Sequence, residues 1–219
     1  MKDAMNSIAI CAYSIRARGL FLLISMTLGG CAVPTLPGAP VRPAIYDFGP
    51  GALTPPAASR TSPATPLIVA AVEASPALDS TAILYRLAYT DAQQLRPYAQ
   101  ARWSMPPADL VRQRLREALG QNRTLLNPGK NELPPRTLRL ELEEFSQLFE
   151  TPERSVGLLR LRATLVQPRP GGEQWLAQRS FVVQRPAASA NAPGGVQALS
   201  AATDAAAQEI EAWLQAMPL

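Results

Sequence analysis

A cysteine at the end of a short apolar run is the residue of this chain best placed for covalent chemistry. Leu28, Gly29 and Gly30 lead directly into Cys31, and the apolar run before them begins at Gly19. The two glycines are small enough for a peptidase pocket, and the thiol of Cys31 can carry a diacylglyceryl group before cleavage makes it the new N-terminus. The spacing therefore predicts a lipobox. The alternative is an ordinary secretory signal cleaved nearby, which would leave Cys31 as a free thiol.

The segment in front of Cys31 reads as an export signal. Its apolar run has about ten residues, whereas a membrane-spanning helix needs about twenty, and Lys2, Arg16 and Arg18 form a basic region before it. One acyl chain anchors a protein only marginally, at roughly 0.8 kcal/mol per buried methylene, so we expect a multiply acylated cysteine. The expected organisation is a signal peptide over residues 1–30, a lipidated tether over residues 31–43 and one periplasmic domain over residues 44–219.

The amino-acid composition argues against catalysis. Histidine is absent from the sequence, and Cys11 and Cys31 are its only cysteines. The most common general base and transition-metal ligand is therefore missing, which excludes Ser-His-Asp and Cys-His mechanisms. A carboxylate-only or Ser-Lys mechanism remains, but cleavage leaves Lys130 as the one lysine, in a loop-like sequence. We expect no enzymatic activity, no cofactor and no metal site.

The charge pattern argues against nucleic acid as a partner. Residues 1–30 carry three cationic side chains and one anionic side chain, so their removal lowers the net charge from +4 to +2. No run of basic residues is long enough to follow a phosphate backbone.

The tether contains a proline at every third position. Pro34, Pro37, Pro40 and Pro43 match the three residues per turn of polyproline II, which would give a semi-rigid strut roughly 35 Å long. The alternative is a disordered proline-rich linker. Both arrangements hold the following domain away from the membrane surface.

Short strands and a helix are expected in the first half of the domain. The pattern predicts strands over residues 44–48, 67–72 and 82–89, with the last two as antiparallel partners. Residues 94–98 fit a further strand at a sheet edge, because Pro97 cannot donate to a ladder. A helix is expected from Pro106 to Gly120, with a proline and an acid in its first turn.

The middle of the chain predicts an antiparallel strand pair. Apolar and charged residues alternate over residues 138–143 and 159–165, and a turn at Thr151 places Glu141 opposite Arg162 and Glu143 opposite Arg160. The alternation slips near Glu144, which indicates a β-bulge.

A third strand and a second helix complete the expected fold. Residues 175–183 fit the third strand of a meander, residues 186–195 a flexible loop, and residues 196–217 a long helix in which Trp213 faces the core. The fold class is therefore α+β, with an antiparallel sheet and two helices packed on one face.

Three segments resemble the ABC-type transport auxiliary lipoproteins, a family that includes the paraquat-inducible-type (PqiC/YmbA-like) lipoproteins. They are residues 46–50, residues 83–86 and, most specifically, residues 94–107, where an arginine-tryptophan pair leads through two prolines into a helix. The resemblance runs from the lipobox to the C-terminal helix.

The resemblance implies an outer-membrane lipoprotein that faces the periplasm and docks an ABC lipid transport system. Such a system contains an MCE-domain protein, a permease and an ATPase, and moves phospholipid between the two membranes. The chain lacks a nucleotide loop of its own, and Ala32, in place of aspartate after the lipobox cysteine, is consistent with sorting to the outer membrane. By analogy with a symmetric MCE partner, a homo-oligomer is also expected. Two alternatives remain, an outer-membrane assembly factor and a periplasmic lipid-binding lipoprotein.

Aromatic and arginine residues of the matching segments have two interpretations. A structural role is favoured for Tyr85 and Trp103, with Arg102 stacked or paired beside the tryptophan. Tyrosine and arginine also dominate protein interfaces, so a partner surface is the second interpretation. The candidate partner residues are Arg86, Arg96, Tyr98 and Arg102.

Overall fold

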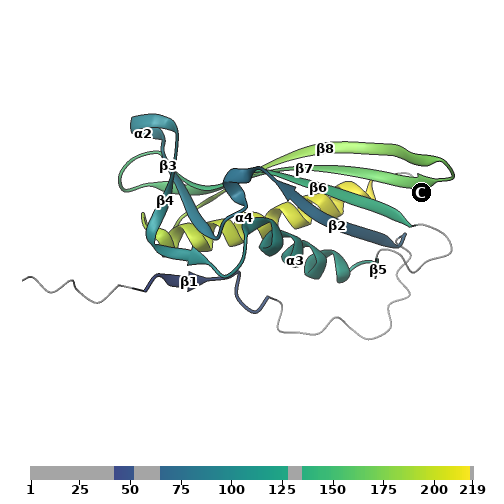
Figure 1. Ribbon diagram of the computed structural model, residues 1–219, viewed down its shortest axis with the longest axis horizontal. Coiled ribbons are helices and arrows are strands. Elements are labelled where there is room, and N and C mark those ends of the chain that lie inside the picture. The colour runs from purple at the N-terminus through teal and green to yellow at the C-terminus, as the bar shows by residue number, and fades with distance from the viewer. Residues whose placement is uncertain (1–41, 52–64, 128–134, 218–219) are drawn as a thin grey trace, which may run out of the picture. The chain divides into compact units, whose positions relative to one another are not determined.

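One mixed sheet of eight strands carries the fold. The structure is a computed structural model that describes residues 42–51, 65–127 and 135–217 (Figure 1). Three of its strands form the expected antiparallel meander: β6 (Arg136–Phe149), β7 (Ser155–Arg169) and β8 (Gly172–Pro186). The β6–β7 turn closes at Thr151, whose amide donates to the Arg154 carbonyl at 3.2 Å. Gly171, at the tip of the β7–β8 turn, has a φ of 91°, which favours glycine.

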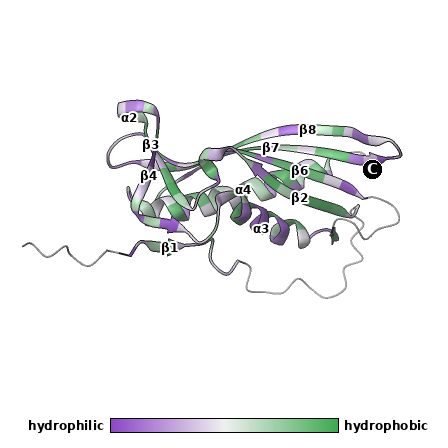
Figure 2. Cartoon of the chain, viewed as in Figure 1, coloured by the Kyte–Doolittle hydropathy of each residue, from purple (hydrophilic) through white to green (hydrophobic). Residues whose placement is uncertain are grey.

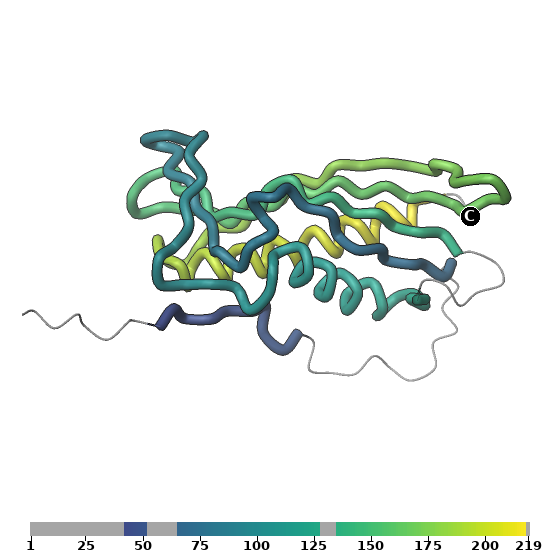
Figure 3. Tube along the Cα trace, in the orientation of Figure 1, coloured from purple at the N-terminus to yellow at the C-terminus, as the bar shows by residue number. Residues whose placement is uncertain are grey.

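Two strands lie end to end along the other side of β6. Both β2 (Leu67–Ala74) and β3 (Ala82–Leu87) run parallel to β6, β2 beside its first half and β3 beside its second half. The short 3₁₀ turn η1 (Pro76–Leu78) joins them, as the chain trace shows (Figure 3). The expected antiparallel pairing of these two segments is wrong, because each finds its partner in β6.

The remaining strands extend the sheet at both ends. After the short helix α2 (Ala88–Asp91), β4 (Ala92–Trp103) pairs antiparallel with β3. The strand β1 (Ala44–Tyr46) pairs parallel with the last three residues of β4. Pro97 lies on β4 outside that pairing, at the expected sheet edge. At the other end, β5 (Leu125–Leu126) pairs with the start of β2.

Two helices cover one face of the sheet, as expected. α3 (Pro107–Gly120) packs against β2, and α4 (Ala192–Gln215) packs against β6, β7 and β8. Figure 2 shows that α3 mixes hydrophilic and hydrophobic residues, as a half-buried helix must, whereas β2 is largely hydrophobic. The loop expected over residues 186–195 is shorter than that, because the Asn191 side chain accepts a hydrogen bond from the Gly194 amide and starts α4 at Ala192.

A β-bulge on β6 explains why its alternation slips. Leu142 pairs with Leu161, and the next pair is Glu144 with Arg160, so Glu143 is the extra residue. Before the bulge the even-numbered leucines of β6 face the core, and after it Phe145 faces the core instead. The expected opposition of Glu141 to Arg162 is confirmed, while that of Glu143 to Arg160 is shifted by one residue.

The α+β class is therefore confirmed, and the sheet is mixed and not antiparallel throughout. The strands that pair with near neighbours in sequence are antiparallel, whereas β1, β2, β3 and β5 form parallel pairs with distant strands. Trp213 is buried against Phe181, with ring centroids 6.0 Å apart, so its expected core position is confirmed.

Candidate docking surfaces

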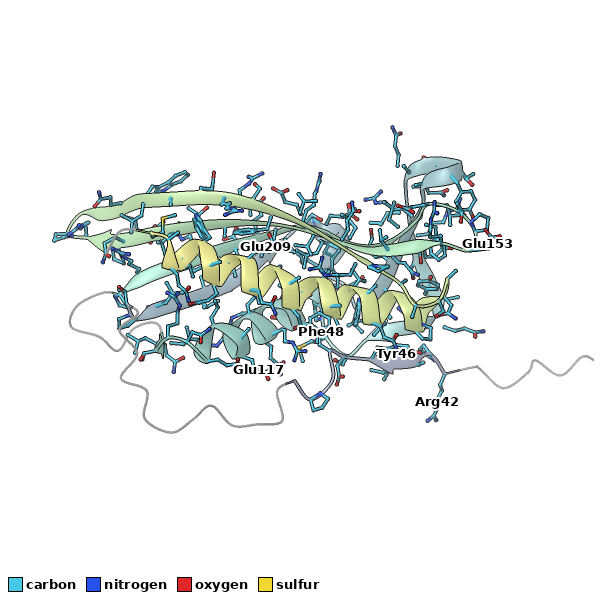
Figure 4. All side chains as sticks on the ribbon, turned by 180° about the vertical axis from the view of Figure 1, so that it is seen from behind. Arg42, Tyr46, Phe48, Glu117, Glu153 and Glu209 are labelled. Atoms are coloured by element: carbon cyan, nitrogen blue, oxygen red, sulfur yellow. The ribbon has the colours of Figure 1, made fainter. Side chains whose placement is uncertain are left out.

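The predicted lipid anchor lies outside the described residues. Leu28, Gly29, Gly30 and Cys31 belong to residues 1–41, and the described chain begins at Arg42. From there it forms β1 and passes beside the helices, where Figure 4 labels Tyr46 and Phe48 on this segment and Glu117 on α3. Ile45 on β1 is 72% exposed.

Three aromatic rings fix this entry segment to the core. Phe48 lies 5.6 Å from Trp103 and 6.0 Å from Phe145, and Trp103 lies 5.7 Å from Phe145, measured between ring centroids. Trp103 is only 2% exposed. The structural interpretation of Trp103 is confirmed, because this ring joins β1's continuation, β4 and β6.

A second aromatic group lies farther along β3 and β4. Tyr85 lies 4.7 Å from Tyr98 and 5.9 Å from Phe149, again between centroids. The Tyr98 hydroxyl donates to the side-chain oxygen of Gln147 at 2.8 Å, and the Gln147 amide donates to the Ser155 hydroxyl at 2.7 Å. Burial, with a smaller contribution from the neighbouring Tyr85, raises the pKa of Tyr98 well above its usual range. Tyr98 is therefore part of a hydrogen-bonded chain inside the fold.

Tyr98→Phe is expected to lower the free energy of unfolding by about 1 kcal/mol at neutral pH, because Gln147 loses its donor. Above about pH 10 the unfolded chain ionises Tyr98 while the folded chain resists ionisation, so native stability falls as pH rises. Tyr98→Phe should remove this alkaline loss of stability. Urea unfolding at pH 7 and pH 10.5 measures both effects; Tyr89→Phe, at a 47% exposed residue, is the control and should change neither. An unchanged alkaline loss in Tyr98→Phe would contradict the assignment.

Arg86 holds the start of β4 to the sheet. Its guanidinium donates to both carboxylate oxygens of Glu144, at 3.2 and 3.0 Å, and to the carbonyls of Ala92 and Gln93, at 3.2 and 3.0 Å. Ser146 donates to the same Glu144 carboxylate at 2.6 Å. This set of contacts closes the turn around α2 and leaves little of Arg86 for a partner.

The other two candidate arginines lie in different surroundings. Arg96 pairs with Tyr85 across the ladder, on the face opposite Arg86, and its guanidinium donates to Gln94. Arg102 is exposed beside Ile45 and Ala82, and no ion pair or hydrogen bond of its side chain is found among the described residues. It is not stacked on Trp103 as expected. The structure therefore brings Arg96 and Tyr98 to one face of the β3–β4 pair and leaves Arg86 and Arg102 on the other.

A polar groove of about 560 Å³ separates α3 from α4. Arg114 on α3 donates to both carboxylate oxygens of Asp204 on α4, one of them at 3.2 Å, and lies 3.4 Å from Glu117. The hydrogen bond to Asp204 raises the pKa of Arg114 above its usual value, against the opposing effect of burial, and the charges of both acids add to the rise. An acyl chain requires an apolar lining, so this groove does not support the lipid-binding alternative.

Sequence reasoning missed this helix–helix pair. Asp204 is the first acid along an alanine-rich helix, which is the signal that indicates a specific contact. This signal does not identify Arg114 as the partner of Asp204, because the two residues are 90 positions apart. A similar pair joins Arg123 to Glu211, where the side chains are 5% and 10% exposed.

The face of the sheet opposite the helices carries charge pairs and a few exposed apolar groups. Arg162 contacts Glu141 and the bulged Glu143, and Arg139 lies 2.6 Å from Glu173. These exposed pairs contribute little each. The large exposed apolar residues of the described chain are Ile45, Tyr89, Trp175, Leu176 and Val182. Three of them, Trp175, Leu176 and Val182, lie on β8.

Two further features of the described ranges bear on the function. No helix there is both long and apolar enough to cross a lipid bilayer. In the same ranges, no group of three or more acidic, cysteine or histidine side chains is arranged to hold a metal ion.

The comparison with protein families decides the identity. Residues 46–211 match the family described as ABC-type transport auxiliary lipoprotein component. The chain belongs to this family. The match confirms the resemblance of the three segments and makes the chain an envelope lipoprotein associated with an ABC transport system. The matched region starts at the last residue of β1 and ends in the last third of α4, so it covers α3, most of α4 and the whole sheet apart from Ala44 and Ile45.

Solved structures support the fold of this transport auxiliary lipoprotein. It is similar to protein XCC0632 from Xanthomonas campestris, at 21% identity over 78% of this chain and 94% of that one, with a TM-score of 0.63. It is also similar to an uncharacterized protein at 13% identity, over 79% and 99% of the two chains, with a TM-score of 0.60. No functionally curated protein is significantly similar in sequence.

Proposed function

We propose that this lipoprotein is a non-enzymatic docking component of an MCE-type ABC lipid transport system, fixed to the outer membrane through acylated Cys31. The observation that carries the proposal is the family match over residues 46–211. In this arrangement residues 1–30 are removed, residues 31–43 form the tether, and residues 44–219 form one periplasmic domain. The domain binds the MCE-domain protein, and the ATPase and permease of the system supply the transport.

The ion pairs of the described domain narrow the set of candidate partner residues. Its arginines are engaged in structural ion pairs at Arg86, Arg114 and Arg123. Of the candidate partner residues, Arg102 is exposed and its side chain is uncommitted among the described residues, next to the exposed Ile45. We therefore propose Arg102 as the member of that set that contacts the partner, since exposed arginine and apolar side chains together favour an interface.

Cys31→Ser is expected to abolish labelling with radioactive palmitate and to release the protein from membranes, because acylation needs the thiol of Cys31. Cys11→Ser is the matched control: it removes the other cysteine, within the signal segment, and should leave labelling and anchoring unchanged. Density separation of the two membranes then locates the wild-type protein. Persistent labelling of Cys31→Ser, or recovery of the wild type in inner-membrane fractions, would contradict the proposed anchor or its location.

Recovery of the partner tests the docking role. The full lipoprotein, purified from membranes in mild detergent, should retain an MCE-domain protein, and Arg102→Glu should reduce that recovery severalfold. Arg154→Glu is the matched control, since the Arg154 side chain is 72% exposed on the β6–β7 turn, outside the pairing of β1 with β4. Repeated absence of an MCE-domain protein after cross-linking would overturn the docking function. Loss of an outer-membrane protein on depletion, with phospholipid distribution intact, would instead favour an assembly factor.

A further inference from the structure

β8 leaves one long side of the sheet without a partner strand. Over its 15 residues, β8 pairs with β7 alone among the described strands, and Figure 1 shows it at the edge of the sheet. The edge at β4 is partly covered by β1, and at the other end β5 covers only Leu67 and Ile68 of the eight-residue β2. An uncovered edge of this length presents a row of unpaired backbone donors and acceptors.

The hydrogen bond from the Ala187 amide to the Ser155 carbonyl, at 2.9 Å, shows which backbone groups of β8 are free. It makes Ala187 and Ser155 a hydrogen-bonded pair in the same register as Pro186 and Val156. In an antiparallel ladder such pairs alternate with pairs that point their backbone groups outward. The outward-pointing residues are therefore Gln178, Ser180, Val182 and Gln184, followed in the same phase by Pro186, which has no amide hydrogen to leave unpaired.

The side chains along this edge are cationic on one face and partly apolar on the other. Arg179 is exposed, and its guanidinium lies 5.1 Å from the ring centroid of Phe181. Arg185, on the same face, donates to the Gln184 carbonyl at 2.8 Å. Neither arginine has a carboxylate partner among the described residues. On the opposite face, Val182 is 59% exposed.

A second copy of β8 does not complement this edge. The one acid of β8 is Glu173, which is already paired with Arg139 at 2.6 Å, and no acidic residue occurs between Gln174 and Pro186. Pairing of two such edges would bring arginines together without a neutralising carboxylate, and like charges across a ladder are destabilising. The complementary strand must supply the negative charge.

We propose that the free edge of β8 binds an extended acidic segment of a partner protein by strand addition. The segment's backbone bonds to the outward groups of Gln178, Ser180 and Val182 and to the Gln184 amide, and carboxylates six positions apart on one face pair with Arg179 and Arg185. Small or apolar side chains on its other face cover Val182. The proposal goes beyond the docking function, because it requires neither an acylated Cys31 nor an MCE-domain partner.

The test uses the full lipoprotein in detergent and a synthetic nine-residue peptide of threonine and valine with glutamate at its second and eighth positions. Residue-by-residue hydrogen exchange should show the amides of Gln178, Ser180, Val182 and Gln184 exchanging freely alone and becoming protected when the peptide binds. The peptide should bind at least tenfold more tightly than the same peptide with glutamine in place of glutamate. The variant Arg179→Glu/Arg185→Glu should reverse the order and prefer a lysine peptide, whereas Arg154→Glu should bind as the wild type does.

Three results would overturn strand addition at β8. The first is absence of new protection at these amides with saturating peptide. The second is equal affinity for the glutamate and glutamine peptides. The third is protection of the same amides before any peptide is added, in a protein that sediments as a dimer, since a second copy would then occupy the edge. None of these results depends on recovery of an MCE-domain protein or on palmitate labelling.

Discussion

Arg123→Met is expected to lower the free energy of unfolding by about 3–5 kcal/mol, because it leaves the buried carboxylate of Glu211 without its counterion. Arg123 donates to the two oxygens of Glu211 at 3.0 and 2.8 Å, and the side chains are only 5% and 10% exposed. Gln215 donates to the same carboxylate at 2.9 Å, but a neutral amide cannot replace the lost charge. Urea unfolding followed by circular dichroism measures the loss.

The double variant Arg123→Met/Glu211→Leu separates the lost charge from the lost packing. It removes both members of the pair, so most of the stability should return. A second control is Arg154→Met. The partner of Arg154, Glu150, is 43% exposed, so this variant should lower the free energy of unfolding by less than about 1 kcal/mol. If the single Arg123 variant were no less stable than the Arg154 variant, the pair would have to be solvent-accessible in solution.

Gly157→Ala is expected to lower the free energy of unfolding by about 1–3 kcal/mol, because β7 approaches the backbone of α4 at this residue. A Cβ on Gly157 would lie 2.6 Å from the carbonyl carbon of Ala198 and 2.7 Å from the amide nitrogen of Leu199. Both atoms are backbone atoms in the middle of a packed helix, so neither can move alone. The helix would have to shift from the sheet along much of its length.

Gly120→Ala is the matched control for this substitution. At the end of α3 the added methyl would meet Leu125 at 3.6 Å, an ordinary contact, and alanine favours the helix. This variant should be neutral or more stable by up to about 1 kcal/mol. Urea unfolding measures both effects, from the midpoint concentration when the denaturant slope is unchanged. If the two substitutions changed the free energy of unfolding equally, the contact of β7 with α4 would be looser than in the structure.

The part of the fold that depends on near neighbours in sequence could be predicted. The β6–β7–β8 meander, its turns and both long helices follow from alternation, proline and glycine, and even the bulge at Glu143 left a visible slip in the pattern. The tandem arrangement of β2 and β3 could not be predicted. Two apolar runs joined by a short turn have the same local pattern in a hairpin as in this arrangement, and only β6, some sixty residues later, distinguishes the two.

The candidate sites, too, could be predicted only where they depend on residues that are neighbours in sequence. The proposed lipobox is contiguous, so its residues and their chemistry could be predicted together at residues 28–31, outside the described residues. Arg86, Arg96, Tyr98 and Arg102 carry the right side chains for an interface, but their two faces depend on the register of β3 with β4. The edge of β8 is unpaired because none of the described strands lies on its outer side. The residue types of β8 do not indicate this.

The end-to-end placement of β2 and β3 along β6 has a consequence for the order in which the chain matures. A polypeptide is made from its N-terminus, so β1 to β4 and α3 emerge before the strand that pairs with β2 and β3. Until β6 is available, β3 can pair only with β4 and β2 has no long partner strand, so their apolar residues stay accessible to aggregation or to chaperones. Completion of the sheet therefore requires the second half of the chain, because β6 joins β2, β3 and β7.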